Sequence, residues 1–402
     1  MIYRAIGECR ACFGVNLSPF VDLGWQPPSN DFVECGHLQY PLKVMVCEDC
    51  GLGQLADVVD PGEIFNNSYA YYSSQSPSWL EDRRVLADRM INEFRLDAAS
   101  LVVDVGSNDG YYLRHYVERG IGVRGFEPAE NVAEAARRIG VPTDTKFWSR
   151  SVHALGADLV NATNVLAHTP DMDSFVEGVA ASLLRDGVAT LEFPLFSNLI
   201  KFNQLDTIYH EHYSYISIRA LRVVLSRHGL RIWRIEELAT HGGSVRVFAC
   251  KETARYLEES SVERVAGAEL FAPEHNFEDA ARQLKITALR QLAEIGKESY
   301  VIGYGAPAKA TVLSNYLGLD RSLIEFTVDD SPYKQGKRIP GTNIPIVSFE
   351  CLGEGAEVPD YIVLFVWNLI EPIKKKLQQH YAGVVLPPKL VTLVPKFTVT
   401  EI

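Results

Sequence analysis

Residues 101–110 read Leu101-Val-Val-Asp-Val-Gly106-Ser-Asn-Asp-Gly110. The first five residues form a short apolar run, which is typical of a strand buried in a parallel sheet. The two glycines follow directly, and glycine at a strand-to-helix turn lets the backbone approach a ligand closely. The stretch therefore predicts the first strand of an α/β domain, with a ligand site at its carboxyl end.

The sequence that follows repeats this pattern. A second strand is expected at 122–126, and it ends in Glu127, at about the distance where an acidic residue contacts the ribose hydroxyls of a bound nucleotide. A helix is expected at 129–139, and further strands are expected at 157–160 and 188–193. Alternating strands and helices predict a doubly wound parallel sheet.

The glycine turn lacks the third glycine of the dinucleotide-binding pattern, which argues against an NAD site. The combination of Asp104 and Gly106, the acidic residue after the second strand, and a polar loop containing Asn164 instead resembles the class I S-adenosylmethionine-dependent methyltransferases. That resemblance implies S-adenosylmethionine as cofactor. The cofactor-binding residues it implies are Asp104, Gly106, Ser107, Asn108, Gly110, Glu127 and Asn164.

A second glycine turn, Gly303-Tyr-Gly305-Ala-Pro-Ala-Lys309, begins another α/β unit. Strands are expected before it and at 324–328, 361–367 and 390–394, which predicts a C-terminal Rossmann-like domain. The helix starting near residue 308 could hold a phosphate through its amides and the charge of Lys309. Lys334 lies in a basic loop that is either a solvated surface or a second phosphate contact.

Four cysteines form two CxxC pairs, Cys9 with Cys12 and Cys47 with Cys50. Each CxxC turn lets two thiolates face one tetrahedral ion, so the pairs predict a closed structural zinc site. Buried thiols or two disulfides are the alternatives. The segment between the pairs has too little apolar material for a core of its own, so metal binding would contribute to its folding. Cys35, Cys250 and Cys351 are expected to be isolated core thiols.

The segment Tyr209-His-Glu-His-Tyr213 places two phenols, two imidazoles and a carboxylate in five consecutive residues. These are the usual members of a general acid/base site, although a solvated histidine-rich loop has the same composition. Adjacent residues on a strand face opposite ways, so Glu211 and His212 can share a pocket only if this segment is an irregular loop. The cluster of tyrosines and serines at 69–76 could similarly be a surface loop or the lining of a polar pocket.

Length and composition indicate the number of domains, the classes of partner that are excluded, and the location of the protein. The 402 residues suggest two or three domains, which we expect to be a zinc module (1–75), a cofactor-binding core (76–252), and a helical connector with the C-terminal domain (253–402). The net charge of −12 argues against nucleic-acid binding. No apolar run reaches the length of a membrane span, and the first residues lack the apolar segment of a secretion signal. A cytoplasmic monomer is expected.

The whole set of motifs, in this order, is similar to the zinc-containing sugar C-methyltransferases that act on nucleotide-linked, typically dTDP-linked, 4-keto-deoxysugars. The similarity spans residues 5–397. It implies that His212 is the base, with Tyr209, Glu211, Asn164 and His168 around the sugar. It also implies a catalytic tyrosine from the end of the zinc module, Tyr71, with Tyr69 or Tyr72 as the alternatives. The third domain resembles the one that helps hold the nucleotide diphosphate, and Lys309 and Lys334 are the substrate contacts expected there. The chain departs from the family at Tyr213-Ser-Tyr215-Ile216 and at Ala310, which bears on the shape of the substrate.

The expected reaction is methyl transfer from S-adenosylmethionine to a carbon next to a ketone, at C-3 of the sugar, after His212 has removed a proton. O- or N-methylation, a non-sugar carbon acid, and a non-catalytic nucleotide-sugar-binding protein are the alternatives. His168 and His241 could also be turn residues, and His210 is expected to be structural. A second metal at His210 and His212 is disfavoured because no further ligand cluster stands out.

Overall fold

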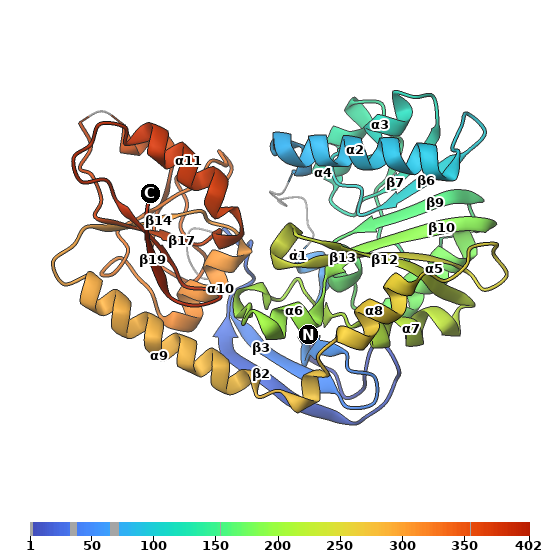
Figure 1. The fold of residues 1–402 in the computed structure, drawn as a ribbon, viewed down its shortest axis with the longest axis horizontal. Helices are drawn as coiled ribbons and strands as arrows, with labels where there is room; N and C mark the ends of the chain where they lie inside the picture. The colour runs from blue at the N-terminus through green and yellow to red at the C-terminus, as the bar shows by residue number, and fades with distance from the viewer. Residues whose placement is uncertain (1–2, 33–37, 65–71, 153, 354) are drawn as a thin grey trace.

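The computed structural model describes residues 3–32, 38–64, 72–152, 154–353 and 355–402. Three parts of the chain surround a common centre (Figure 1): a central domain at the right, a C-terminal domain at the left, and N-terminal strands below them.

The central domain is built on a seven-stranded sheet with the order β12-β13-β10-β9-β6-β7-β8. Its first strand, β6 (Leu101–Val105), pairs in parallel with its neighbours on both sides, while β13 is antiparallel to β10 and β12. The other strands are β7 (Gly122–Phe126), β8 (Thr143–Asp144), β9 (Ala157–Thr163), β10 (Leu183–Pro194), β12 (Leu230–Leu238) and β13 (Ser244–Lys251). A parallel sheet closed by an antiparallel strand is the class I methyltransferase architecture that the sequence predicts.

Two helices of this domain begin at serine residues that cap them. In α2 (Pro77–Phe94), Ser76 accepts a hydrogen bond from the Trp79 amide, and proline occupies the first turn. In α7 (Ile218–Arg227), Ser217 caps the helix in the same way. The remaining helices are α3 (Arg114–Val117), α4 (Glu130–Arg138), α5 (Met172–Ser182) and α6 (Phe196–Lys201).

The N-terminal part contains a two-stranded sheet, β1 (Tyr3–Ala5) with β5 (Asp57–Val59), and a four-stranded sheet of order β11-β4-β3-β2. Three strands of the larger sheet come from this part: β2 (Leu17–Gln26), β3 (Tyr40–Cys47) and β4 (Gly53–Leu55). The fourth, β11 (Ser214–Tyr215), comes from the chain of the central domain and pairs antiparallel with β4. The short helix α1 (Pro61–Ile64) follows.

The C-terminal domain has a six-stranded sheet of order β16-β15-β14-β17-β18-β19. Its strands are β14 (Val301–Tyr304), β15 (Thr327–Val328), β16 (Ile346–Val347), β17 (Tyr361–Leu364), β18 (Lys389–Thr392) and β19 (Thr398–Glu401), with helices α10 (Ala308–Leu317) and α11 (Ile370–His380). The expected connector contains α8 (Ser260–Ala268) and α9 (Phe277–Ile295). The Rossmann-like pattern is present, but three strands are shorter than expected: β15 starts at 327, β17 ends at 364, and β18 ends at 392.

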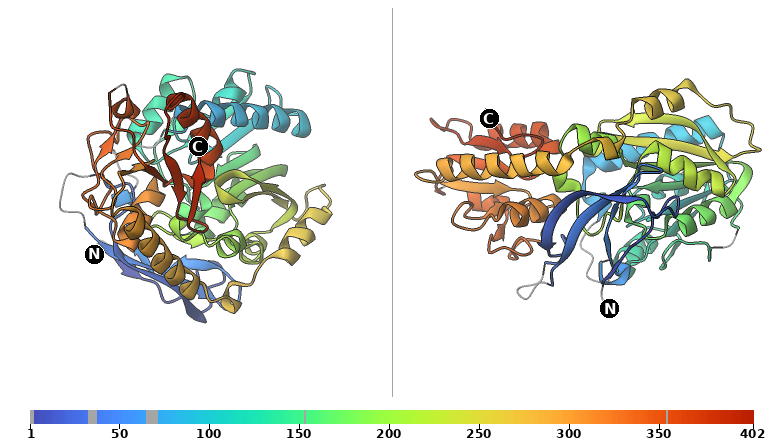
Figure 2. Two further views of the ribbon diagram at one scale, coloured as in Figure 1. Left: turned by 60° about the vertical axis from the view of Figure 1, so that its left-hand side comes forward. Right: turned by 90° about the horizontal axis from the view of Figure 1, so that it is seen from below.

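Apolar residues of the N-terminal sheet are buried in a cluster that includes residues of the C-terminal domain. Phe20 stacks on Phe277 of α9 with ring centroids 4.8 Å apart, and the same cluster holds Val44, Leu205 and Leu313. The N-terminal part therefore shares its core with its neighbours. Figure 2 shows its strands lying between the two larger domains. Within the described ranges, no helix combines the length and apolarity needed to cross a membrane.

Candidate active site

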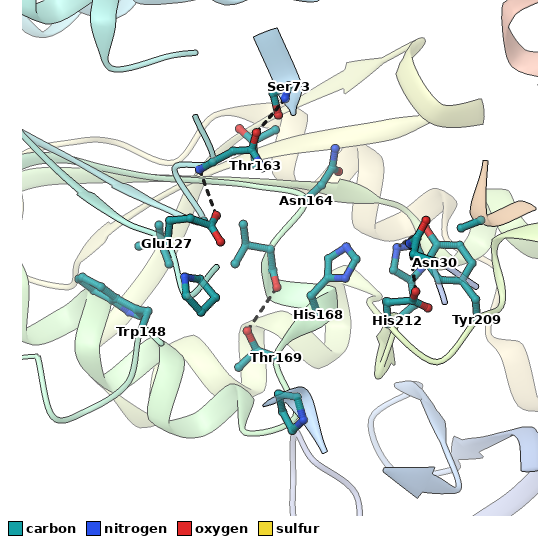
Figure 3. A pocket seen from close by; sticks show the side chains of 18 of the residues that line it. Asn30, Ser73, Glu127, Trp148, Thr163, Asn164, His168, Thr169, Tyr209 and His212 are labelled. Atoms are coloured by element: carbon teal, nitrogen blue, oxygen red, sulfur yellow. Dashed lines mark hydrogen bonds between the residues drawn. The ribbon is translucent and has the colours of Figure 1, made fainter. Parts of the chain in front are cut away.

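A cavity of about 840 Å³ lies where the three parts meet. Its lining includes Asn30, Asp60 and Ser73 from the N-terminal side, Gly106, Asn108, Glu127, Trp148, Asn164, His168, Tyr209, Glu211 and His212 from the central domain, and Lys309, Lys334 and Asn368 from the C-terminal domain. In Figure 3, Trp148 and Glu127 lie at one side and Tyr209 and His212 at the other, with His168 between them.

Glu127 lies at the end of β7 and lines one side of the cavity. Its two carboxylate oxygens accept one hydrogen bond each, from the amides of Asn108 (3.1 Å) and Ala129 (2.9 Å). Burial raises the pKa of Glu127 to about 7, and the two amides oppose this. Each oxygen retains acceptor capacity for a ribose hydroxyl. Lys146, Phe147 and Trp148, which sequence reasoning missed, also line the cavity, and the last two provide an aromatic surface.

The glycine turn is tightly packed. Gly106 has φ +66°, and a Cβ there would lie 2.4 Å from a methyl carbon of Val165, which also lines the cavity. A side chain is therefore excluded. Asn108 is also at positive φ, and it accepts a hydrogen bond from the Ser73 amide at 2.7 Å. The turn therefore lines the cavity and also anchors the segment that precedes α2.

Three of the predicted cofactor-binding residues are not among the described lining residues: Asp104, Ser107 and Gly110. Asp104 is buried and accepts a hydrogen bond from the Asn161 side chain at 2.6 Å. Burial raises its pKa to about 7. Gly110, at φ +79°, packs against Val141. Asp104 therefore supports the turn from the strand before it, while Ser107 and Gly110 belong to the turn itself.

Asn164 follows β9 at φ +55°, and its amide donates to the Glu192 carbonyl. Its side-chain oxygen Oδ1 is buried without a hydrogen-bond partner among the described residues. An unmatched buried acceptor suits the ammonium group of a methionyl moiety. With Glu127 and the closely packed glycine turn, it fits S-adenosylmethionine, which supplies an electrophilic methyl group when bound.

His212 is held at both ring nitrogens. Nδ1 lies 2.8 Å from the Thr207 carbonyl, and Nε2 lies 2.9 Å from the Tyr209 hydroxyl. A carbonyl can only accept, so Nδ1 carries the proton in the neutral ring, and Nε2 is the basic nitrogen. The 209–213 segment is a loop, as predicted.

His168 packs edge-on against His212, with ring centroids 4.7 Å apart. Burial lowers the pKa of His168 to about 4, partly opposed by the Glu211 carbonyl. His168 is therefore neutral near pH 7, and it does not place a second positive charge beside the His212 ring.

Glu211 is buried and accepts hydrogen bonds from Ser29 (2.7 Å) and Asn30 (3.1 Å) of the N-terminal part. Burial raises the pKa of Glu211, and these two partners oppose the rise. Thr311 of α10 in turn donates to the Ser29 carbonyl at 2.9 Å. Sequence reasoning missed Ser29 and Asn30, whose only signal is a run of polar residues after two prolines.

The C-terminal domain contributes cations to the cavity. Lys309 lines it, and its Nζ lies 3.4 Å from the buried carboxylate of Asp206, which also accepts from the Trp367 indole at 2.7 Å. Lys334 donates to the Ala306 carbonyl at 3.0 Å, and burial lowers its pKa. The Ala306 amide is already bonded to Asp329, so the amides of this turn are not all open to a phosphate.

Two tyrosines from the end of the zinc module, Tyr71 and Tyr72, were predicted to contact the substrate. Tyr71 lies outside the described residues. Tyr72 is not among the described lining residues; it stacks on Tyr333 of the C-terminal domain and accepts a hydrogen bond from Asn131. His210 is buried, in keeping with a structural role. His241 lies in a short 3-10 turn, so it is a turn residue as the sequence suggested.

The four predicted metal ligands, Cys9, Cys12, Cys47 and Cys50, converge. All four sulfurs lie within 4.8 Å of one another, and two of the pairs are 3.5 Å apart. A tetrahedral ion with Zn–S bonds of about 2.3 Å needs sulfurs ~3.8 Å apart, so the cluster fits a structural zinc ion that it encloses completely. Cys250 is a buried thiol as expected, but Cys351 is exposed, because it lies in a short surface helix. Cys35 lies outside the described residues.

Comparisons with known families divide the chain into three matched regions. A zinc binding domain matches residues 9–65, a methyltransferase domain matches 79–235, and a C-methyltransferase C-terminal domain matches 239–395. The C-methyltransferase NovU of Streptomyces niveus is 34% identical over 387 residues, which cover 91% of each chain.

Two solved methyltransferase structures each resemble less than half of this chain. Magnesium protoporphyrin IX methyltransferase from Synechocystis, with bound SAH, is 16% identical with a TM-score of 0.36, covering 43% of this chain and 82% of its own. A SAM-dependent methyltransferase from Aquifex aeolicus is 17% identical with a TM-score of 0.35, covering 47% of this chain and 97% of its own. The family models and the relative from Streptomyces niveus together show that the chain belongs to the zinc-containing, S-adenosylmethionine-dependent C-methyltransferases.

Proposed function

We propose that this enzyme methylates the carbon next to the ketone of a nucleotide-linked deoxysugar, at C-3 of a dTDP-4-keto-deoxysugar, with His212 as the base. The observation that carries the proposal is the His212 ring, whose basic Nε2 lies in the cavity beside the Tyr209 hydroxyl. A carbon must lose a proton before it can attack a methyl group, and an oxygen or nitrogen acceptor has less need of such a base.

The residues around His212 suit an enolate. A ketone acidifies the neighbouring C–H bond, and Nε2 takes that proton while the pair of electrons moves onto the ketone oxygen. The Tyr209 hydroxyl is the described donor nearest this nitrogen, and one such donor to an oxyanion is worth about 3 kcal/mol. Neutral His168 can donate or accept toward a sugar hydroxyl.

Both ends of the cavity support a two-substrate reaction. Gly106, Glu127 and Asn164 form the end that suits the methyl donor. Lys309 and Lys334 at the opposite domain provide positive charge in an acidic protein, which suits the diphosphate of a nucleotide-linked sugar. We assign Tyr71 as a further donor to the sugar, as the family resemblance implies.

The test is isotope exchange in heavy water. The enzyme is incubated with a dTDP-4-keto-deoxysugar without the methyl donor, and deuterium at the carbon next to the ketone is followed by mass spectrometry. Exchange is expected for the wild type, and a loss of about 10²- to 10⁴-fold for His212→Asn. Tyr209→Phe should slow exchange about 10²-fold.

His228→Asn is the matched control, because His228 pairs with Asp173 outside the cavity; it should exchange at the wild-type rate. Methylated product without wild-type exchange, and only modest slowing in His212→Asn, would instead indicate O- or N-methylation. Neither exchange nor product across a panel of keto-sugar nucleotides would indicate a binding protein.

A further inference from the structure

We propose that Arg10 is a positioning residue, which ties the zinc-binding turn directly to the loop that carries His212. This inference rests on the proposed function only in taking His212 as the base. It assigns to the zinc site a specific task in the reaction, namely to hold the 209–213 segment in register through one side chain.

Arg10 lies between the first two cysteine ligands, and its guanidinium points to the end of the 209–213 segment. Nη1 donates to the Tyr213 carbonyl at 2.8 Å, and Nη2 donates to the Leu55 carbonyl at 3.0 Å. The Leu55 amide also donates to the Tyr213 carbonyl, at 3.0 Å. Arg10 therefore holds two segments of the chain together, the end of β4 at Leu55 and the residue before β11, Tyr213. Tyr213 directly follows His212.

The charge of Arg10 needs a partner that the nearby side chains do not supply. The side chain is 7% exposed, and no carboxylate of the described ranges lies within ion-pair distance of it. A buried charge is costly unless it is compensated. Four cysteine thiolates around a zinc ion carry a net negative charge, and Cys9 is the adjacent residue. The metal cluster is thus the counter-charge that lets a guanidinium bind two neutral carbonyls in a dry site.

The zinc-binding turns also contact the central domain, through side chains that do not bond to the 209–213 segment. Two arginines of α7 donate to carbonyls inside the CxxC turns: Arg227 to Ala11 at 2.7 Å, and Arg219 to Asp49 at 2.9 Å. The planar, five-donor guanidinium of Arg10 can then hold two acceptors at a fixed angle, which a lysine ammonium cannot do.

Arg10→Met tests the clamp in the full-length enzyme, with Arg227→Met as the matched control. Both remove an arginine that contacts the same zinc-binding turn, but Arg227 does not contact the 209–213 segment. Four quantities are measured: zinc content, S-adenosylhomocysteine affinity, kcat and KM for methyl transfer, and amide hydrogen exchange over residues 211–215. Arg10→Met should keep zinc and the ligand affinity, lose at least tenfold in kcat, and exchange at least tenfold faster over 211–215. Arg227→Met should stay within about twofold of the wild type in kcat and in this protection.

Arg10→Lys keeps the charge beside the thiolates and serves if Arg10→Met loses its metal. It should retain zinc and show intermediate kcat and protection. Wild-type kcat and wild-type protection in a zinc-loaded Arg10→Met or Arg10→Lys enzyme would overturn the proposal. The protection readout does not depend on which residue is the base, so failure of the His212 assignment and failure of the clamp give different results.

Discussion

Three histidines near the cavity show how the same side chain is given different tasks by its surroundings. His212 has a hydrogen-bonding partner at each nitrogen and lines the cavity. His168 touches it but is kept neutral by burial. His210 is buried against the N-terminal sheet, with Tyr40 edge-on to its ring. Of the three, His212 is the one that we propose as the base.

His210 gives a prediction about acid stability. Burial lowers its pKa to about 4, opposed by carbonyls of Pro41, Tyr40 and Pro27, whereas in an unfolded chain it titrates near 6.5. Below pH 6.5 the unfolded state therefore binds a proton that the folded state does not, and stability is lost as pH falls toward 4. This histidine should cost about 2 kcal/mol between pH 7 and pH 5.

His210→Phe isolates that effect, because groups with raised pKa such as Glu127 act in the opposite direction in both proteins. The difference in urea unfolding between wild type and His210→Phe should shift by about 2 kcal/mol in favour of the variant from pH 7 to pH 5. A difference that is the same at both pH values would show that folding does not lower the pKa of His210.

At this scale the sequence predicts residues whose chemistry is unusual, and it misses those whose chemistry is ordinary. Four cysteines at CxxC spacing and the Tyr209–Tyr213 composition are informative in themselves. Ser29, Asn30 and Asp206 are common polar residues, and their importance comes only from lying against Glu211 and Lys309 after folding. No local pattern could have identified them.

The loop from residue 205 to 213 is held by its neighbours in addition to its own hydrogen bonds. Its start contacts the C-terminal domain through Asp206, and Glu211 contacts the N-terminal part. Tyr213 is anchored to the N-terminal strands by its hydroxyl, which donates to the Val59 carbonyl at 2.8 Å. An irregular loop can thus be as well positioned as a strand.

Trp367→Phe should loosen the start of this loop, because the buried Asp206 carboxylate loses its indole donor. Such a loss costs about 2 kcal/mol, equivalent to roughly 30-fold faster amide exchange over residues 205–208. Trp233→Phe is the matched control, since that buried indole nitrogen has no hydrogen-bond partner among the described residues. Equal exchange in the two variants would contradict the role of the Trp367–Asp206 bond.

Elements with strong local patterns agree with the sequence. The strand at 122–126 has the predicted bounds, and the helix expected at 129–139 spans Glu130–Arg138. The strand expected at 188–193 is longer than predicted, because residues 183–187, whose composition is typical of a turn, join β10 with a register irregularity between Leu183 and Val188. Pairing with β9 overrides the turn propensity of Arg-Asp-Gly, and such tertiary pairing cannot be read from one strand.

On the scale of the whole molecule, the zinc site and the cofactor turn lie in different parts of the chain. Removing zinc should therefore affect methyl transfer but not the binding of S-adenosylhomocysteine. We expect a mercurial reagent to release zinc and abolish methyl transfer, while S-adenosylhomocysteine still binds, because Gly106, Glu127 and Asn164 all belong to the central sheet. Metal release is followed with a chromogenic chelator, and ligand binding by calorimetry.

A Cys250→Ser, Cys351→Ser double variant is the control for that experiment, since it lacks two thiols outside the zinc cluster. It should release zinc and lose activity in parallel, as the wild type does. Activity lost before any zinc is released would assign the effect to another thiol.

The sequence predicts the three parts of the molecule, but it does not predict how they pack together. Separate motifs predict a zinc module, a methyltransferase core and a Rossmann-like domain, but the N-terminal strands proved to share one apolar cluster with α9 and α10. Packing between residues hundreds of positions apart leaves no periodic signal. The prediction that the site is shared by all three parts came from the family resemblance.

The four-stranded N-terminal sheet has a consequence for the order of events on the ribosome. Its last strand, β11, emerges roughly 160 residues after β4, which at typical synthesis rates is a delay of about 10–30 s. During that interval the edge of β4 has no strand to pair with, and an unpaired edge invites association with other chains. Zinc captured early by the nascent cysteines would keep this first-made segment compact until its missing strand arrives.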